Sequence, residues 1–139
     1  MNTTRVEEVL QAYAAIWSEA NAVRREALMA KSLAHDAEVV GPGYHFKGYQ
    51  AISAEVERFL TRDPGSRAVL ASGFLMHHNL VRFAVAMVSA EGRVVAEGED
   101  IVEFGTDGRI VKVLTFWGAL PPVPESWPSE LVTPRQNGA

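Results

Sequence analysis

One carboxylate in the sequence lies on an otherwise apolar face of an expected strand. Asp100 shares that face with Val102 and Phe104. Because side chains alternate across a strand, its carboxyl is expected to point into the interior. Burial disfavours the charged form and raises the pKa of a carboxyl, which can then donate or accept a proton near neutral pH. Asp100 is therefore our candidate acid or base, although a hydrogen bond to the backbone at a bulge near Gly98 would explain the same pattern.

A pair of histidines is the second candidate for proton transfer. His77 and His78 stand at the end of an expected strand, just before Asn79. Neighbours on a strand point to opposite sides, so one imidazole should face the cavity and the other should face solvent. Two turn histidines with only local hydrogen bonds fit the pattern equally well. A metal site is not expected, because adjacent histidines diverge and the remaining ligands would have to come from distant residues.

Large apolar side chains are expected to form the wall of a ligand pocket. Tyr13 and Trp17 are four residues apart and share a helix face. Rings with polar tips suit a ligand wall as well as an ordinary core, whereas Phe and Val on strands are more typical of a core. The residues that we expect to bind a substrate are Tyr13, Trp17, Tyr44, Phe59, Phe83, Val85 and Trp117.

Helices are expected first along the chain, and strands follow. Apolar residues at helical spacing predict helices over residues 4–20, 21–36 and 49–62. Strands are expected at 37–41, 44–48, 67–77, 80–90, 94–104 and 109–118, separated by turns rich in Gly, Pro, Asn and Asp. The last four strands follow one another through hairpin turns, which predicts an antiparallel meander.

This order of elements predicts an α+β fold. Gly73 and Gly98 lie inside expected strands, where glycine often marks a bulge or a sharp bend. Two bends would curl the antiparallel sheet into a cone-shaped half-barrel. The three helices of the N-terminal half would cover its concave face and enclose a pocket. One domain is expected over residues 1–120.

Residues 121–139 are rich in proline and lack periodicity, which is typical of an extended tail. We expect this tail to contribute little to the fold. Trp127 and Leu131 could nevertheless dock on the body or on a partner subunit. The convex face of the sheet would also remain half apolar, because three helices cannot cover both faces of four long strands. A homodimer formed through the sheet is therefore expected.

Four segments of the chain resemble the SnoaL-like domain family of the nuclear-transport-factor-2-like superfamily. They read AAIWSEAN, LAHDAEVVGPG, FKGYQAISAEVERFL and GEDIVEFGTDGRIVKVLTFWG. The resemblance covers about residues 4–120 and implies a cone-shaped sheet around a pocket. The superfamily includes polyketide cyclases, ketosteroid isomerases, dehydratases, epoxide hydrolases and proteins with no known catalysis. The resemblance therefore implies a fold and does not assign a reaction.

The ketosteroid isomerases allow a comparison residue by residue. The resemblance places their oxyanion-hole aspartate on Asp100 and their pocket tryptophan on Trp117. Their helix tyrosine falls near Trp17, or on Tyr13 one turn earlier. Their general-base aspartate falls on Gly41, which has no side chain. We therefore do not expect isomerisation of 3-ketosteroids.

Composition excludes several classes of function. The chain of 139 residues has no cysteine, which excludes disulfides and thiolate catalysis. Its net charge of -4 argues against nucleic acid or a membrane surface as a partner. The sequence shows no motif for a nucleotide or for a serine hydrolase, and we expect no cofactor. The N-terminus has no basic segment followed by a long apolar one, so a cytoplasmic protein is expected.

Three functions remain open. The first is a cofactor-independent isomerase, cyclase or dehydratase that acts on an apolar carbonyl-containing or polycyclic compound by acid/base proton transfer. In this enzyme Asp100 would act with His77 or His78. The second is non-catalytic binding or sequestration of a small hydrophobic molecule in the same pocket. The third is a structural protein that binds a partner through its sheet.

Overall fold

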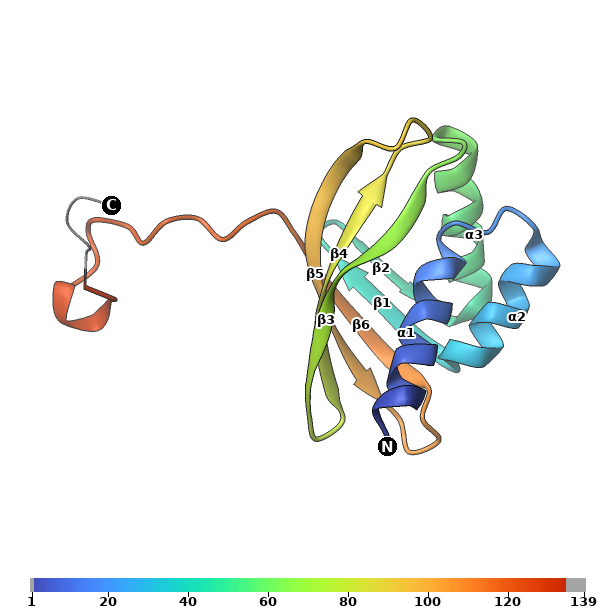
Figure 1. Cartoon of the computed structure of the whole chain (residues 1–139), viewed down its shortest axis with the longest axis horizontal. Coiled ribbons are helices and arrows are strands. Elements are labelled where there is room, and N and C mark those ends of the chain that lie inside the picture. Colours follow the sequence, from blue (N-terminus) through green and yellow to red (C-terminus); the bar gives the residue numbers. More distant parts are fainter. Residues whose placement is uncertain (1, 135–139) are drawn as a thin grey trace.

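A curled sheet with helices on one face forms the body of the protein (Figure 1). The computed structural model describes residues 2–134. Within them the helices are α1 (Thr3–Ile16), α2 (Ala22–Ser32) and α3 (Gly48–Arg62), and a short 3₁₀ turn covers Ser129–Leu131. The strands are β1 (Leu33–Gly41), β2 (Tyr44–Lys47), β3 (Arg67–His77), β4 (Leu80–Val88), β5 (Val94–Phe104) and β6 (Ile110–Trp117). The α+β prediction, with helices covering a curled sheet, is confirmed.

The sheet is mixed rather than wholly antiparallel. Its strand order is β2-β1-β6-β5-β4-β3, and β1 pairs with β6 in parallel. The meander from β3 to β6 and the β1–β2 hairpin are antiparallel, as expected. Hairpin turns reveal only which strands pair with their neighbours in sequence. The β1–β6 pair joins strands separated by most of the chain, so no hairpin turn in the sequence indicates this pairing.

The boundary between α2 and β1 was placed too late in the sequence. The helix ends at Ser32 and the strand begins at Leu33, whereas the pattern predicted helix to residue 36. Met29 and Leu33 are both buried and four residues apart, which imitates one helix face. An irregularity between Leu33 and Glu38 also breaks the alternation of β1. The first helix likewise ends at Ile16 rather than at residue 20.

The two glycines that were expected to bend the sheet behave differently. The register between β3 and β4 shifts between Leu70 and Phe74, a stretch that contains Gly73. Gly98, by contrast, pairs regularly with Val85 on β4 and with Trp117 on β6. A Cβ atom on Gly98 would lie 2.7 Å from Cε3 of Trp117. Gly98 therefore makes room for an indole ring and does not mark a bulge.

The core fills the space between the helices and the sheet. It contains Val6, Val9 and Ile16 of α1 together with Val102 and Val113 of the sheet, and all five are fully buried. Asn2 and Asn21 cap α1 and α2, because each side chain accepts a hydrogen bond from a backbone N–H three residues later. Some residues of this core also line the cavity described below, among them Tyr13 and Phe83.

The chain leaves the body after β6. In Figure 1 the segment that follows Gly118 extends away from the side of the sheet opposite the helices. A hydrogen bond of 2.8 Å from the Gly118 N–H to the carbonyl of Glu97 ties its beginning to β5. In the described part of the chain no helix has the length and apolar character that crossing a membrane requires.

Candidate functional site

A cavity of about 230 Å³ lies between the concave face of the sheet and the helices α1 and α3. Most of its lining is apolar. The lining residues are Tyr13, Ala14, Trp17, Val39, Tyr44, Phe46, Glu55, Phe59, Arg62, Ala68, Val69, Leu70, Phe83, Val85, Met87, Asp100, Thr115 and Trp117. A concave apolar site with a few polar groups is typical of small-molecule binding.

Asp100 is the buried carboxylate of this cavity, and only 3% of its surface is exposed. It lies in β5 between Phe83 of β4 and Thr115 of β6. The Thr115 hydroxyl donates a hydrogen bond of 2.6 Å to Oδ1 of Asp100. Burial raises the pKa of Asp100 to about 6, and the bond from Thr115 offsets part of that rise. Asp100 can therefore exchange a proton near neutral pH.

Tyr13 adds a buried phenol from α1. Burial raises its pKa well above the usual value near 10, and the charge of Asp100 raises it further, whereas a hydrogen bond with Trp17 opposes the change. The hydroxyl therefore keeps its proton at neutral pH. Tyr13 and Asp100 both line the cavity.

Two aromatic residues line the cavity near the ends of β1 and β6. The indole Nε1–H of Trp117 donates a hydrogen bond of 3.3 Å to the Tyr44 hydroxyl. The Tyr44 ring also stacks on Phe46, with ring centroids 5.6 Å apart. These contacts hold a second phenol at the cavity surface. Charged side chains of α3 lie at the rim, where Arg62 packs 5.9 Å above the Phe59 ring and pairs with Asp63.

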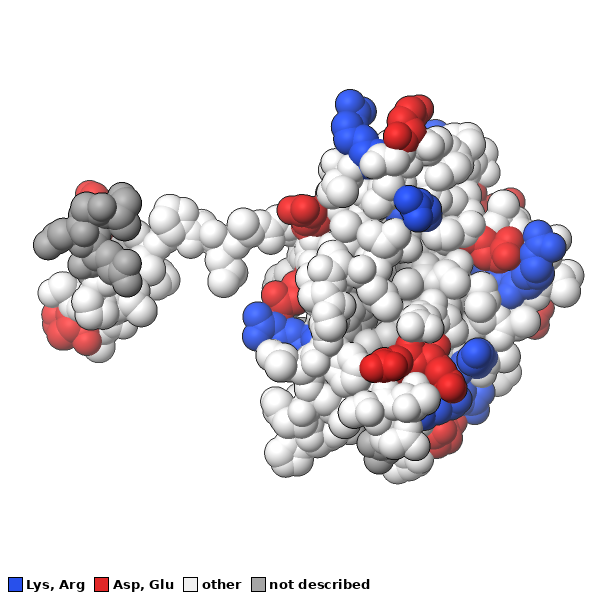
Figure 2. Space-filling model, viewed as in Figure 1, with Lys and Arg blue, Asp and Glu red and all other residues white. Residues whose placement is uncertain are grey.

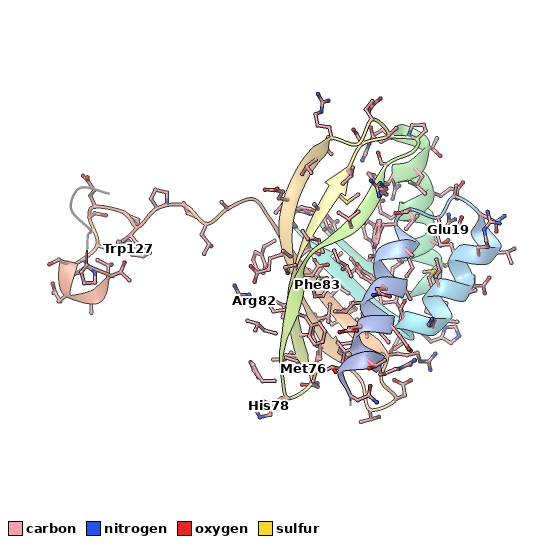
Figure 3. The ribbon with its side chains drawn as sticks, viewed as in Figure 1. Glu19, Met76, His78, Arg82, Phe83 and Trp127 are labelled. Atoms are coloured by element: carbon pink, nitrogen blue, oxygen red, sulfur yellow. The ribbon has the colours of Figure 1, made fainter. Side chains whose placement is uncertain are left out.

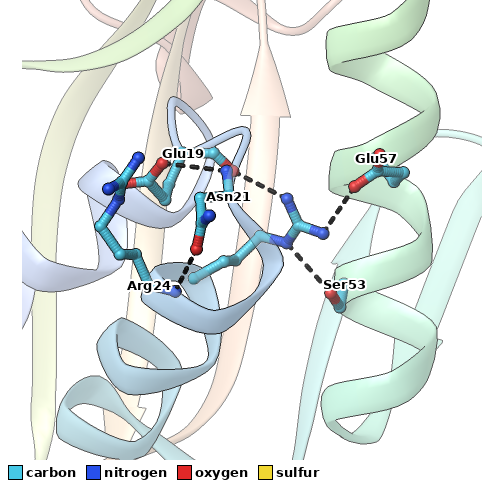
Figure 4. Close-up of polar contacts among 6 residues, drawn as sticks. Glu19, Asn21, Arg24, Ser53 and Glu57 are labelled. Atoms are coloured by element: carbon cyan, nitrogen blue, oxygen red, sulfur yellow. Dashed lines mark hydrogen bonds and ion pairs between the residues drawn. The ribbon is translucent and has the colours of Figure 1, made fainter.

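A buried arginine connects the two helices that line the cavity. Figure 4 shows Glu19, in the turn after α1, and Ser53 and Glu57, on the helix α3. Arg25, in α2, is 2% exposed and donates hydrogen bonds to the Glu19 carbonyl (2.7 Å), to Ser53 Oγ (3.0 Å) and to Glu57 Oε2 (2.7 Å). These three hydrogen bonds fix the position of α3 relative to the end of α1. Arg25 could not be recognised from the sequence, because nothing in the helix pattern distinguishes a buried arginine from an exposed one.

The structure brings eight of the ten predicted site residues to the cavity. All seven residues that were expected to bind a substrate line it, and so does Asp100. His77 and His78 do not. Both are exposed, their Nδ1 atoms lie 3.1 Å apart, and Figure 3 shows His78 at the tip of the β3–β4 hairpin, far from Phe83. The expectation that one of them faces the pocket is therefore wrong.

The histidines were misplaced because the cavity occupies only one end of the curled sheet. Alternation tells which face a side chain takes but not how far along the strand the core ends. Thr115 was missed for a related reason. The β5–β6 register shifts between Glu103 and Phe104, so counting from the turn does not place Thr115 beside Asp100.

No group of three or more His, Asp or Glu side chains that could hold a metal ion occurs among residues 2–134. The polar groups that line the cavity are instead spread over several elements. They are suited to hydrogen bonding and to proton transfer.

The fold recurs in solved structures. A proposed isomerase of the SnoaL-like family from Agrobacterium tumefaciens is 34% identical, and the match covers 84% of this chain and 100% of that one, with a TM-score of 0.76. A proposed polyketide cyclase from Sinorhizobium meliloti is 16% identical over 77% of this chain and 92% of its own, with a TM-score of 0.60. A proposed ketosteroid isomerase from Kribbella flavida is 21% identical over 98% and 93%, with a TM-score of 0.57.

The last two similarities concern the fold alone. No family model matches the chain, and no curated protein matches its sequence. The similarity to the Agrobacterium protein, by contrast, extends over the whole length of that protein and joins sequence identity to a shared fold. On this ground the chain belongs to the SnoaL-like family.

Proposed function

We propose that the protein is a cofactor-independent enzyme that binds a small apolar carbonyl compound and transfers a proton to or from it. The reaction class is isomerisation, cyclisation or dehydration. The observation that carries the proposal is Asp100, a carboxyl that is buried in an open cavity and has a pKa of about 6. A pKa near the working pH makes both protonation states available to catalysis.

Each form of Asp100 has a use toward a carbonyl compound. The protonated carboxyl can donate a hydrogen bond to the carbonyl oxygen and stabilise the charge that develops there. The carboxylate can accept a proton from the carbon beside the carbonyl group. Tyr13 keeps its proton at neutral pH and would add a second donor to the same oxygen. The isomerase assignment proposed for the Agrobacterium relative is of the same kind.

The alternative is a binding protein that sequesters a hydrophobic compound without turnover. One observation favours it, because Asp100 has no second buried carboxylate or histidine beside it among the described residues that line the cavity. Glu55, the other carboxylate of the lining, pairs with Arg58 at the rim. A proton taken up by Asp100 would therefore have to be returned by Asp100 itself or by solvent.

Deuterium exchange separates the two functions. The probe is 2-tetralone, a bicyclic ketone with acidic protons beside its carbonyl, and ¹H NMR in deuterated buffer follows its exchange. We expect the protein to accelerate exchange and Asp100→Asn to abolish the acceleration while binding persists. His78→Ala, far from the cavity, should exchange as the native protein does. Binding without any acceleration by the native protein would support the alternative.

A further inference from the structure

Tyr44 occupies the space that a side chain at position 41 would need. Gly41 ends β1 and pairs with Tyr44 across the turn of the β1–β2 hairpin. A Cβ atom on Gly41 would lie 2.1 Å from Cζ and 2.2 Å from the hydroxyl oxygen of Tyr44. Real contacts of this kind do not occur, so glycine is required for the phenol to lie across the strand. An aromatic ring covering a glycine on the neighbouring strand is a known way to stabilise a sheet.

The Tyr44 hydroxyl belongs to the same row of the sheet as Asp100. Thr115 pairs with Asp100 on one side. On the other side of β6 the strand β1 runs parallel, and Leu114 pairs with Val40. The following residues on the two strands are Thr115 and Gly41, which therefore lie side by side. The row therefore carries a carboxyl over β5, a hydroxyl over β6 and the Tyr44 phenol over β1. Phe83 continues it on β4, where the cavity is apolar.

The direction of the hydrogen bonds leaves Tyr44 with a proton to donate. The indole of Trp117 can only donate, so the Tyr44 oxygen accepts and its own O–H is available to another acceptor. The indole holds this position because Gly98 has no side chain to displace it. Two glycines thus permit an aromatic pair that presents one hydroxyl to the cavity.

We propose that Tyr44 donates a hydrogen bond to a second oxygen of the substrate, and that the pocket therefore favours apolar compounds with two oxygen functions. This inference rests on the proposed function for the first oxygen, which Asp100 binds. The Tyr44 hydroxyl lies over Gly41 of β1, and Asp100 lies on β5 with β6 between them. The two groups can therefore bind different oxygens of one ligand.

The test compares 2-naphthol with 1,3-dihydroxynaphthalene, which share a ring system and differ by one hydroxyl. Isothermal titration calorimetry measures both affinities. We expect the native protein to prefer the diol about threefold to tenfold, the value of one added hydrogen bond. Tyr44→Phe should reduce that preference to less than twofold and leave the affinity for 2-naphthol within twofold. Gly41→Ala should have the same effect on the preference, because its methyl group displaces the phenol.

Gly73→Ala is the matched control, since nothing lies within 4 Å of its Cβ position, and it should keep the native preference. The proposal is overturned if Tyr44→Phe keeps the preference, if it weakens both ligands equally, or if the native protein binds neither probe. These outcomes are independent of deuterium exchange. A native protein that fails to accelerate exchange but prefers the diol through Tyr44 refutes the proton-transfer proposal alone.

Discussion

The raised pKa of Asp100 makes the stability of the protein depend on pH. The folded state holds the proton more tightly, with a pKa of about 6 against about 3.9 in an unfolded chain. Below pH 4 both states are protonated and the carboxyl costs nothing. The free energy of unfolding then falls as pH rises from about 4 to about 6, and the loss levels off near 3 kcal/mol above that range.

Asp100→Asn should remove this cost, because its amide oxygen can still accept the hydrogen bond from Thr115. We expect the variant to be more stable than the native protein at pH 8 by up to about 3 kcal/mol, with the gain vanishing at pH 4. Urea unfolding followed by circular dichroism at several pH values measures the difference. A gain that does not depend on pH would contradict the assigned pKa.

Thr115 tunes the same carboxyl. Its hydroxyl donates to Asp100 and lowers the pKa that burial raises. Thr115→Val keeps the shape and removes the donor, so the pKa of Asp100 should rise above 6. Thr115→Ser keeps the hydroxyl and should leave it near the native value. NMR titration of the aspartate carboxyl carbons measures both, and an unchanged pKa in the valine variant would show that the bond has no effect on the charged form.

Asp100 was predictable from the sequence because strand alternation is a local property. The residues beside it depended on longer-range geometry. The glycine at position 41 shows the difference, since the resemblance identified it only as a missing aspartate. The structure shows that Tyr44 fills the place of the missing side chain. No local pattern predicts that a residue three positions later supplies the ring.

At the scale of elements, the pocket depends on the separation of α1 and α3. Arg25→Met would leave the Glu19 carbonyl and Ser53 without their donor, and we expect a loss on the order of 3 kcal/mol in the free energy of unfolding. Arg25→Lys should recover only part of it, because one ammonium cannot span three acceptors in a planar fork. Chemical denaturation measures both variants.

The neighbouring residue provides the control for Arg25. Arg24 is exposed and pairs with Glu19 at the surface, so Arg24→Met should have little effect on stability. Equal losses in the free energy of unfolding for Arg24→Met and Arg25→Met would show that the first turn of α2 tolerates no change. The buried hydrogen bonds of Arg25 would then contribute no more to stability than the surface pair of Arg24.

The elements themselves were largely predictable, and the reason is again locality. Turn residues gave the limits of β3 to β6 to within a few positions, and apolar spacing gave the three helices. The exceptions are the end of α2 and the parallel pairing of β1 with β6. Both are decided by contacts between residues far apart in sequence, such as the pairing of Leu33 with Ile110.

At the scale of the whole molecule, two apolar surfaces lack cover within the described chain. The convex face of the sheet exposes Leu75 and Phe116, at 69% and 63% of their surface, on either side of the Arg82–Glu99 ion pair. Figure 3 shows Arg82 pointing away from the helices, and in Figure 2 the lower end of the sheet carries few charges. The extended segment after Gly118 leaves from this same side and exposes Trp127 and Leu131.

We propose that a second copy of the chain covers the convex face, because apolar side chains this exposed are typical of interfaces. Light scattering coupled to size exclusion should give the mass of a dimer at micromolar concentration. Phe116→Glu should shift the mass to that of a monomer, since two carboxylates would meet or be buried at a symmetric contact.

Val23→Glu is the matched control, because Val23 is 79% exposed on α2, away from the face, and this variant should remain dimeric. A native protein that elutes as a monomer would refute the interface, and it would leave the cavity and Asp100 unaffected because both lie on the concave side.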